Sequence, residues 1–163
     1  MSAKRPNSPR AGTSLGWSCI KTESDIAVIR QVGNTCGQCT ATMLLLQLGI
    51  PVTVGDVINV IGHDNDTAAD ELIAALSLVA KNLTFRAEIQ DDEDESDKGF
   101  ALYHPNWWMG MMMDSRSGSH WLLVRGHGDS EILEVLDSAD GSRSLVSWSE
   151  FSTRWNRIVV RAK

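Results

Sequence analysis

The sequence has few cysteines, no long apolar run and no excess of positive charge. Its three cysteines, Cys19, Cys36 and Cys39, are an odd count in 163 residues, which argues against a disulfide scaffold and favours a reducing compartment. The apolar runs, such as Met43 to Leu46, are far too short to span a bilayer. A net charge of −6 and a pI of about 5.1 disfavour nucleic-acid binding and anionic membrane surfaces. We therefore expect no membrane insertion and no nucleic-acid partner.

The first residues differ in composition from the rest of the chain. Lys4, Arg5 and Arg10 lie among Ser, Pro and Gly, and no apolar stretch follows them as a secretory signal would require. We expect a disordered basic arm at 1–16 and a single domain at 17–163, since 42% hydrophobic residues suffice for a core. The expected location is the cytoplasm, with secretion as an effector by a signal-less route left open.

The first half of the chain has the apolar spacing of helices. Thr53 is a fair N-cap for the second predicted helix and Gly62 ends it, while Asp66 or Thr67 caps the third. The three predicted helices span residues 36–48, 54–61 and 68–80.

The second half has the alternation of strands. Phe100–His104 is expected to be a strand, whereas the apolar segment at 106–113 has no clear period. Trp148 lies in an expected helical turn near the C-terminus. Because helices precede strands, the order predicts an α+β fold rather than alternating βαβ units. The predicted strands lie at 25–31, 83–89, 119–125, 132–137, from 145 onward, and at 158–161.

The segment QVGNTCGQC, residues 31–39, has the features of a thiol nucleophile at a helix start. Cys36 follows a Gly-Asn-Thr turn and opens the predicted helix, where unpaired amides and the helix dipole favour a thiolate. Gly37 leaves room for a substrate backbone, and the amides there can hold an oxyanion. Gln31 can add a side-chain amide donor to that hole.

A cysteine nucleophile also needs a base and an acceptor that orients the base. His120 begins a predicted strand, and Asp137 ends the next one. A tight turn between two antiparallel strands brings these two positions to the same end of the hairpin. The alternatives are His104 as the base and Asp140 as the acid, although Asp140 before Gly141 is typical of a turn.

The order Gln31, Cys36, His120, Asp137 resembles the papain-like cysteine peptidases. Within them it is most similar to the bacterial double-glycine leader peptidases, which trim bacteriocin-type peptides, and to their stand-alone relatives. The resemblance runs from about residue 26 to residue 160. It also includes a buried helix ending in Leu-Gly, the strand HWLLV at 120–124, the stretch VLD at 135–137, and a tail with Leu145, Trp148, Phe151 and Trp155.

The resemblance implies a papain-like α+β fold, with an N-terminal helical part whose nucleophile helix packs on a C-terminal antiparallel sheet. It implies a thiol hydrolase that cleaves a peptide bond, with Cys36 as nucleophile, His120 as base, Asp137 as orienter and Gln31 as oxyanion donor. It also implies a peptide or protein substrate, no metal and no cofactor.

Three positions depart from the family pattern. The spacing from Gln31 to Cys36 is one residue shorter, Thr35 stands where an acid is common, and Ser138 stands where Pro is usual. The same groups would serve a deamidase or an acyltransferase of the toxin or effector type. A catalytically inactive peptide-binding module is the remaining alternative.

Other notable residues have structural interpretations. Cys39 is expected to be a core residue, because a redox C-x-x-C would need a βαβ context and a zinc site would need nearer ligands than His63 and His104. The six acids of Asp91–Asp97 predict an exposed loop. The apolar segment Trp107–Met113 is either core or a surface for a protein partner beside the cleft.

Overall fold

The computed structural model describes residues 20–22, 28–32, 35–62, 68–114 and 118–163, and its described elements form an α+β fold, as predicted. Its helices are α1 (Cys36–Gln47), α2 (Val54–Ile61), α3 (Ala69–Val79), α4 (Ser96–Tyr103) and α5 (Trp148–Phe151). Its strands are β1 (Ile20–Thr22), β2 (Phe85–Ile89), β3 (Trp108–Asp114), β4 (Gly118–Gly126), β5 (Ile132–Asp137), β6 (Ser142–Ser147) and β7 (Trp155–Ala162). The predicted arm at 1–16 lies outside the described residues, so the domain division stays a prediction.

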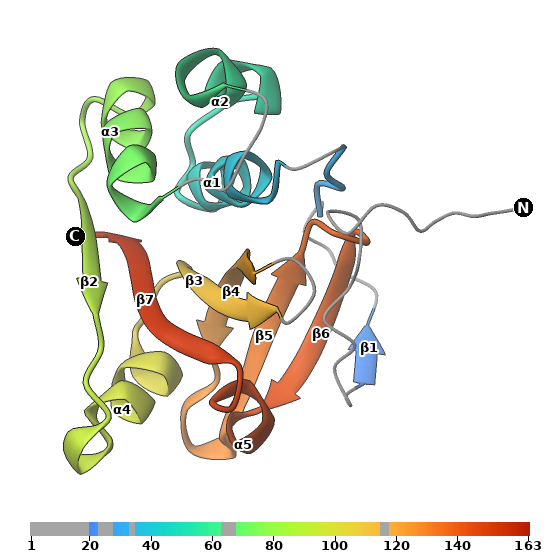
Figure 1. Cartoon of the computed structure of the whole chain (residues 1–163), viewed down its shortest axis with the longest axis vertical. Helices are drawn as coiled ribbons and strands as arrows, with labels where there is room; N and C mark the ends of the chain where they lie inside the picture. Colours follow the sequence, from blue (N-terminus) through green and yellow to red (C-terminus); the bar gives the residue numbers. More distant parts are fainter. Residues whose placement is uncertain (1–19, 23–27, 33–34, 63–67, 115–117) are drawn as a thin grey trace, which may run out of the picture.

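The described strands form one seven-stranded antiparallel sheet in the order β1-β6-β5-β4-β3-β7-β2. Helices α1, α2 and α3 lie together on one side of the sheet (Figure 1), and α4 and α5 pack against its other face. Two apolar clusters fill the molecule. One joins the first three helices to residues such as Leu123 and Leu136, and the other joins α4 and α5 to Leu122 and Val135. Neighbouring residues of a strand therefore serve different cores.

Helix α2 begins and ends where the sequence predicts. The Thr53 hydroxyl accepts a hydrogen bond from the Asp56 amide at 3.2 Å, and the Asp56 carboxylate accepts one from the Thr53 amide at 2.9 Å. Gly62 ends the helix at a φ of 106°, which favours glycine. Helix α3 differs, because its N-cap is Ala68, whose amide donates to Glu71 at 3.0 Å. The predicted caps Asp66 and Thr67 are outside the described residues.

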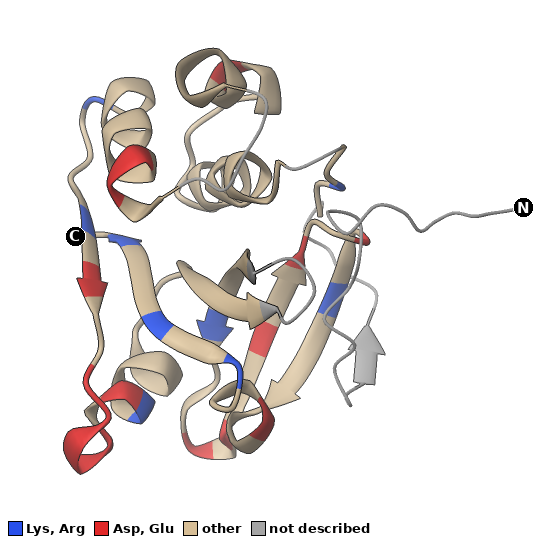
Figure 2. Ribbon diagram, in the orientation of Figure 1, with Lys and Arg blue, Asp and Glu red and all other residues tan. Residues whose placement is uncertain are grey.

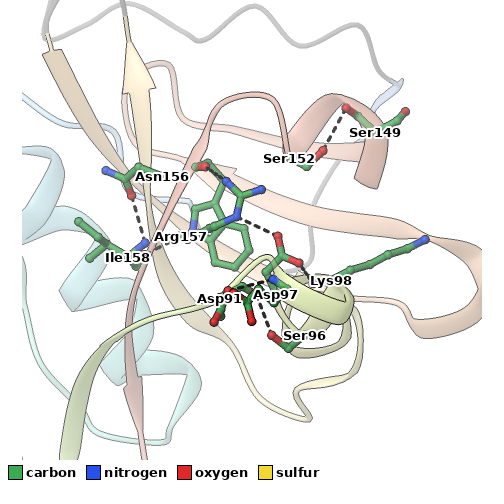
Figure 3. Close-up of polar contacts among 11 residues, drawn as sticks. Asp91, Ser96, Asp97, Lys98, Ser149, Ser152, Asn156, Arg157 and Ile158 are labelled. Carbon is green, nitrogen blue, oxygen red and sulfur yellow. Dashed lines mark hydrogen bonds and ion pairs between the residues drawn. The ribbon is translucent and has the colours of Figure 1, made fainter.

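The acidic segment is the main correction to the predicted fold. A 3₁₀ turn at Glu93–Glu95 leads into α4, so the expected strand at 100–104 is wrong and that stretch is helical. Asp97 is buried and accepts a hydrogen bond from Arg157 Nε of β7 at 2.9 Å (Figure 3). Figure 2 shows the red acidic segment at the lower left, where β2 leads into α4. The expected exposed loop is therefore wrong for Asp97, because a cation sixty positions later compensates its burial.

The segment that lacked a period is strand β3. Trp108 and Met112 pack in one core and Met109 in the other, so both faces are apolar and no alternation is visible. Trp107 is also buried and lies under the Arg125 guanidinium, 4.5 Å from the ring centre to the guanidinium carbon. The predicted partner surface Trp107–Met113 is therefore core, with only the Met113 side chain largely exposed.

Candidate active site

Cys36 is the first residue of α1 and is buried, with 6% of its surface exposed. Thr35 occupies the N-cap position, but its hydroxyl donates to Val32 O at 3.0 Å and does not cap the helix. The first-turn amides of α1 therefore have no side-chain cap, which leaves the helix start suited to a negative charge. This is the environment predicted for Cys36.

Helix α1 is fixed to the strand that carries His120. The Thr40 hydroxyl, one turn beyond Cys36, donates to Trp121 O of β4 at 3.2 Å. Met43 and Leu44 continue the contact in the same apolar cluster as Trp121. This anchoring keeps the first residue of the helix beside the start of β4.

His120 and Asp137 meet as predicted from the hairpin. His120 Nε2 lies 2.7 Å from Asp137 Oδ1, and both side chains are buried. A carboxylate only accepts, so Nε2 donates and Nδ1 faces the other way. The same carboxylate oxygen accepts the Ala139 amide at 2.9 Å, which holds Asp137 at the end of β5. Cys36 lies near enough to the His120 ring to help raise the pKa of the imidazole, so the three predicted residues lie in one region of the fold.

The surroundings of His120 favour its charged form. Burial alone would lower its pKa, but the charge and hydrogen bond of Asp137, with smaller contributions from Cys36, outweigh burial and raise the pKa to about 10. An imidazolium held next to a thiol is the arrangement that stabilises a thiolate.

Gln31 is buried beside the same strand end. The backbone N–H of Gln31 donates to Ser138 O at 2.7 Å, and its side-chain oxygen accepts a hydrogen bond from Ser138 Oγ at 2.8 Å. Ser138 directly follows Asp137, the residue that binds His120. The hydrogen bonds to Ser138 therefore hold Gln31 close to Asp137. The expected oxyanion donor is thus joined to the same region through the backbone of Ser138.

Cys39, His104 and Asp140, the other residues considered for the site, make different contacts. Burial raises the pKa of the Cys39 thiol, despite a hydrogen-bond contact with Thr35 at 3.6 Å. Burial lowers the pKa of His104, which stacks on Phe100 at the end of α4. Asp140 accepts the Ser142 amide at 3.1 Å, as expected of a turn residue. None of these contacts involves His120.

Ser138 is the residue of this region to which sequence reasoning assigned no role. The sequence marked Ser138 only as a departure, because the resembled family usually has Pro at this position. Within the described part of the chain, no group of three or more His, Cys, Asp or Glu side chains is placed to hold a metal ion.

Known proteins resemble this chain in sequence and in fold. No protein-family profile matches the sequence. A curated protein of Escherichia coli O1:K1:H7, named cysteine protease effector 1, is 33% identical over 147 residues, which cover 89% of this chain. The chain spans 28% of the length of that relative.

Solved structures settle the fold. The peptidase domain of Streptococcus ComA, a bi-functional ABC transporter, superposes with a TM-score of 0.64 at 14% identity, covering 84% of this chain and 97% of that domain. A double glycine motif protease from an AMS/PCAT transporter, in complex with its leader peptide, gives 0.64 at 17% identity, covering 88% and 98%. The chain has the papain-like peptidase fold.

The predicted resemblance to double-glycine leader peptidase domains is confirmed at the level of the fold. A peptidase C39-like domain from Vibrio parahaemolyticus is a more distant neighbour, with a TM-score of 0.55 at 10% identity, covering 78% of this chain and 95% of that domain. No helix among the described residues has the length and apolar character needed to cross a bilayer.

Proposed function

We propose that this chain is a papain-like cysteine peptidase with Cys36 as nucleophile, His120 as general base and acid, and Asp137 as the acceptor that orients His120. The observation that carries the proposal is the buried hydrogen bond of His120 to Asp137, at 2.7 Å, with Cys36 at the start of α1 near enough to help raise the pKa of His120. A buried imidazole between a carboxylate and a helix-start thiol has the geometry of nucleophilic acyl transfer.

In the proposed reaction, the thiol proton of Cys36 passes to His120 Nδ1, while Nε2 keeps its hydrogen bond to Asp137. The thiolate attacks the carbonyl carbon of a peptide bond. The resulting oxyanion is held by the amide at the start of α1 and by the Gln31 carboxamide. His120 then protonates the leaving amine, and water, deprotonated by His120, releases the acid product from the thioester.

The comparisons bear on the substrate class. The solved neighbour bound to a leader peptide favours a peptide segment, and the relative is named a cysteine protease effector, a name that specifies no substrate. We infer hydrolysis of an amide bond in a peptide or protein as the shared chemistry. Deamidation or acyl transfer by the same residues is the competing reaction, and loss of catalysis in a binding module is the third alternative.

Intact-mass analysis of candidate peptides and proteins, incubated with wild type and with Cys36→Ala, tests the proposal. We expect two fragments whose masses sum to the substrate plus water, formed by wild type alone. Release of ammonia without new termini would instead identify a deamidase. If Cys36→Ala is as active as wild type, the proposed site is wrong, because a nucleophile cannot be replaced by a methyl group.

Cys39→Ala is the matched control, since it removes a buried thiol one helical turn away and should keep activity.

A further inference from the structure

We propose that Ser138 is a positioning residue that holds the Gln31 carboxamide in the orientation required of an oxyanion donor; this inference rests on the proposed function. Ser138 touches no reacting atom in this scheme. It acts through Gln31, and its role depends on a hydroxyl that proline, the usual residue of the resembled family at this place, does not have.

Two hydrogen bonds join Ser138 to Gln31 in both directions. The Ser138 hydroxyl donates to Gln31 Oε1 at 2.8 Å, and the backbone N–H of Gln31 donates to Ser138 O at 2.7 Å. Both residues are buried, with 0% and 7% of their surfaces exposed. A side chain held by its own backbone and by its terminal oxygen has little rotational freedom left.

The bond to Oε1 determines how the two ends of the Gln31 carboxamide are oriented. A carboxamide has an acceptor oxygen on one branch and an NH₂ donor on the other. Because the Ser138 hydroxyl donates to the oxygen, the oxygen is directed at Ser138 and the NH₂ group lies on the opposite branch. Only the NH₂ group can stabilise an oxyanion, and the reversed orientation would present a repelling oxygen.

The position of Ser138 in the chain couples this donor to the acid of the triad. Asp137 binds His120, and Ser138, the next residue, binds Gln31. The Ala139 amide donates to Asp137 Oδ1 at 2.9 Å and fixes the turn that directs the two side chains to different partners. One strand end thereby positions both the base and the oxyanion donor.

The test compares two reagents that modify Cys36, because no substrate is needed. Acylation by 4-nitrophenyl acetate forms a carbon–sulfur bond through a tetrahedral oxyanion and expels 4-nitrophenolate, whereas alkylation by iodoacetamide passes through no oxyanion. For Ser138→Ala we expect the Cys36 acylation rate to fall by about tenfold to a hundredfold. The alkylation rate should stay within about twofold, since the His120 pair is intact.

A double-mutant cycle separates positioning from a structural effect. In a Gln31→Ala background, Ser138→Ala should cause no further loss of acylation, and Ser138→Thr should retain more acylation than Ser138→Ala in the wild-type background. The control is Ser144→Ala, which removes an equally buried hydroxyl from β6 and should change neither rate.

Equal losses of acylation and alkylation in Ser138→Ala would overturn the inference, as would additive losses in the double variant. Both results would mean that Ser138 acts on Cys36 and His120 rather than on Gln31. Failure of the proposed function is a different result, in which wild-type Cys36 reacts with neither reagent faster than a thiol in the unfolded chain.

Discussion

Strand β5 carries two buried carboxylates, Glu134 and Asp137, that have opposite kinds of surroundings. Glu134 accepts hydrogen bonds from Arg125 at 2.8 Å, from His127 at 3.1 Å and from Arg143. Its partners engage both oxygens, and they lower its pKa although burial alone would raise it.

Asp137 has fewer partners. His120 and the Ala139 amide share its Oδ1, and Oδ2 has no hydrogen-bond partner among the described residues. Among the described residues its side-chain partner is His120, a group that titrates, whereas two of the three partners of Glu134 are arginines with permanent charge. The comparison favours a structural role for Glu134 and supports the proposed catalytic role of Asp137.

Replacing the acid of the triad should have the largest effect. Asp137→Ala removes the group that orients and charges His120, so we expect kcat/KM to fall by about a hundredfold to ten-thousandfold. The assay is the hydrolysis that wild type performs, with folding checked by circular dichroism. Glu134→Gln is the matched control on the same strand and should keep kcat/KM within about threefold when compared per folded molecule.

The stabilisation that comes from His120, the partner of Asp137, and from Glu134 should be lost at opposite ends of the pH range. The folded pKa of His120 is raised from 6.5 to about 10, so its stabilisation is complete below about pH 6.5 and is lost as the pH rises through about 10. The pKa of Glu134 is lowered, so its stabilisation is present above its ordinary value and is lost as the pH falls below that value.

Urea unfolding across pH measures both effects. His120→Gln should flatten the alkaline loss of unfolding free energy, and Glu134→Gln should flatten the acid loss. If the alkaline slope of His120→Gln equals that of wild type, His120 does not carry the charge assigned to it.

Removing the charge of Glu134 should destabilise the fold without affecting the chemistry. Glu134→Gln leaves Arg125 and Arg143 without their anion, and we expect a loss of about 3 kcal/mol in the free energy of unfolding. Both arginines are partly exposed, with 38% and 23% of their side-chain surface in solvent, so water limits the loss. Equal stability of Glu134→Gln and wild type would show that the cluster is not structural.

The smallest effect is expected for the second thiol of α1. Cys39→Ala should cost about 1 kcal/mol of unfolding free energy, because it removes one buried sulfur, and should leave kcat/KM within about twofold. Chemical denaturation and the hydrolysis assay measure the two quantities. A large loss of activity with normal stability would give Cys39 a role in the reaction that its raised pKa does not suggest.

The sequence predicted those parts of the molecule whose signals are local. Thr53 and Gly62 define α2 because a cap and a positive-φ glycine act within one turn. The hairpin β4–β5 and its ends were also visible, so the pairing of His120 with Asp137 could be expected from two strands and a turn.

The features that could not be predicted from the sequence depend on residues far apart in the chain. Asp97 reads as a loop acid unless its ion pair with Arg157 is known. Strand β3 has no alternation because Met109 and Met112 fill opposite cores. Ser138 is an ordinary residue in sequence, and its hydrogen bond to Gln31 spans 107 positions, so only the fold reveals it.

The most direct measurement of the central claim is the rate at which iodoacetamide alkylates each thiol of the native chain at neutral pH, followed by peptide mass spectrometry. The claim is that His120 activates Cys36 as the nucleophile. We predict that Cys36 is alkylated much faster than Cys39 and that His120→Ala abolishes the difference. Equal rates in wild type, or an unchanged Cys36 rate in His120→Ala, would contradict the account.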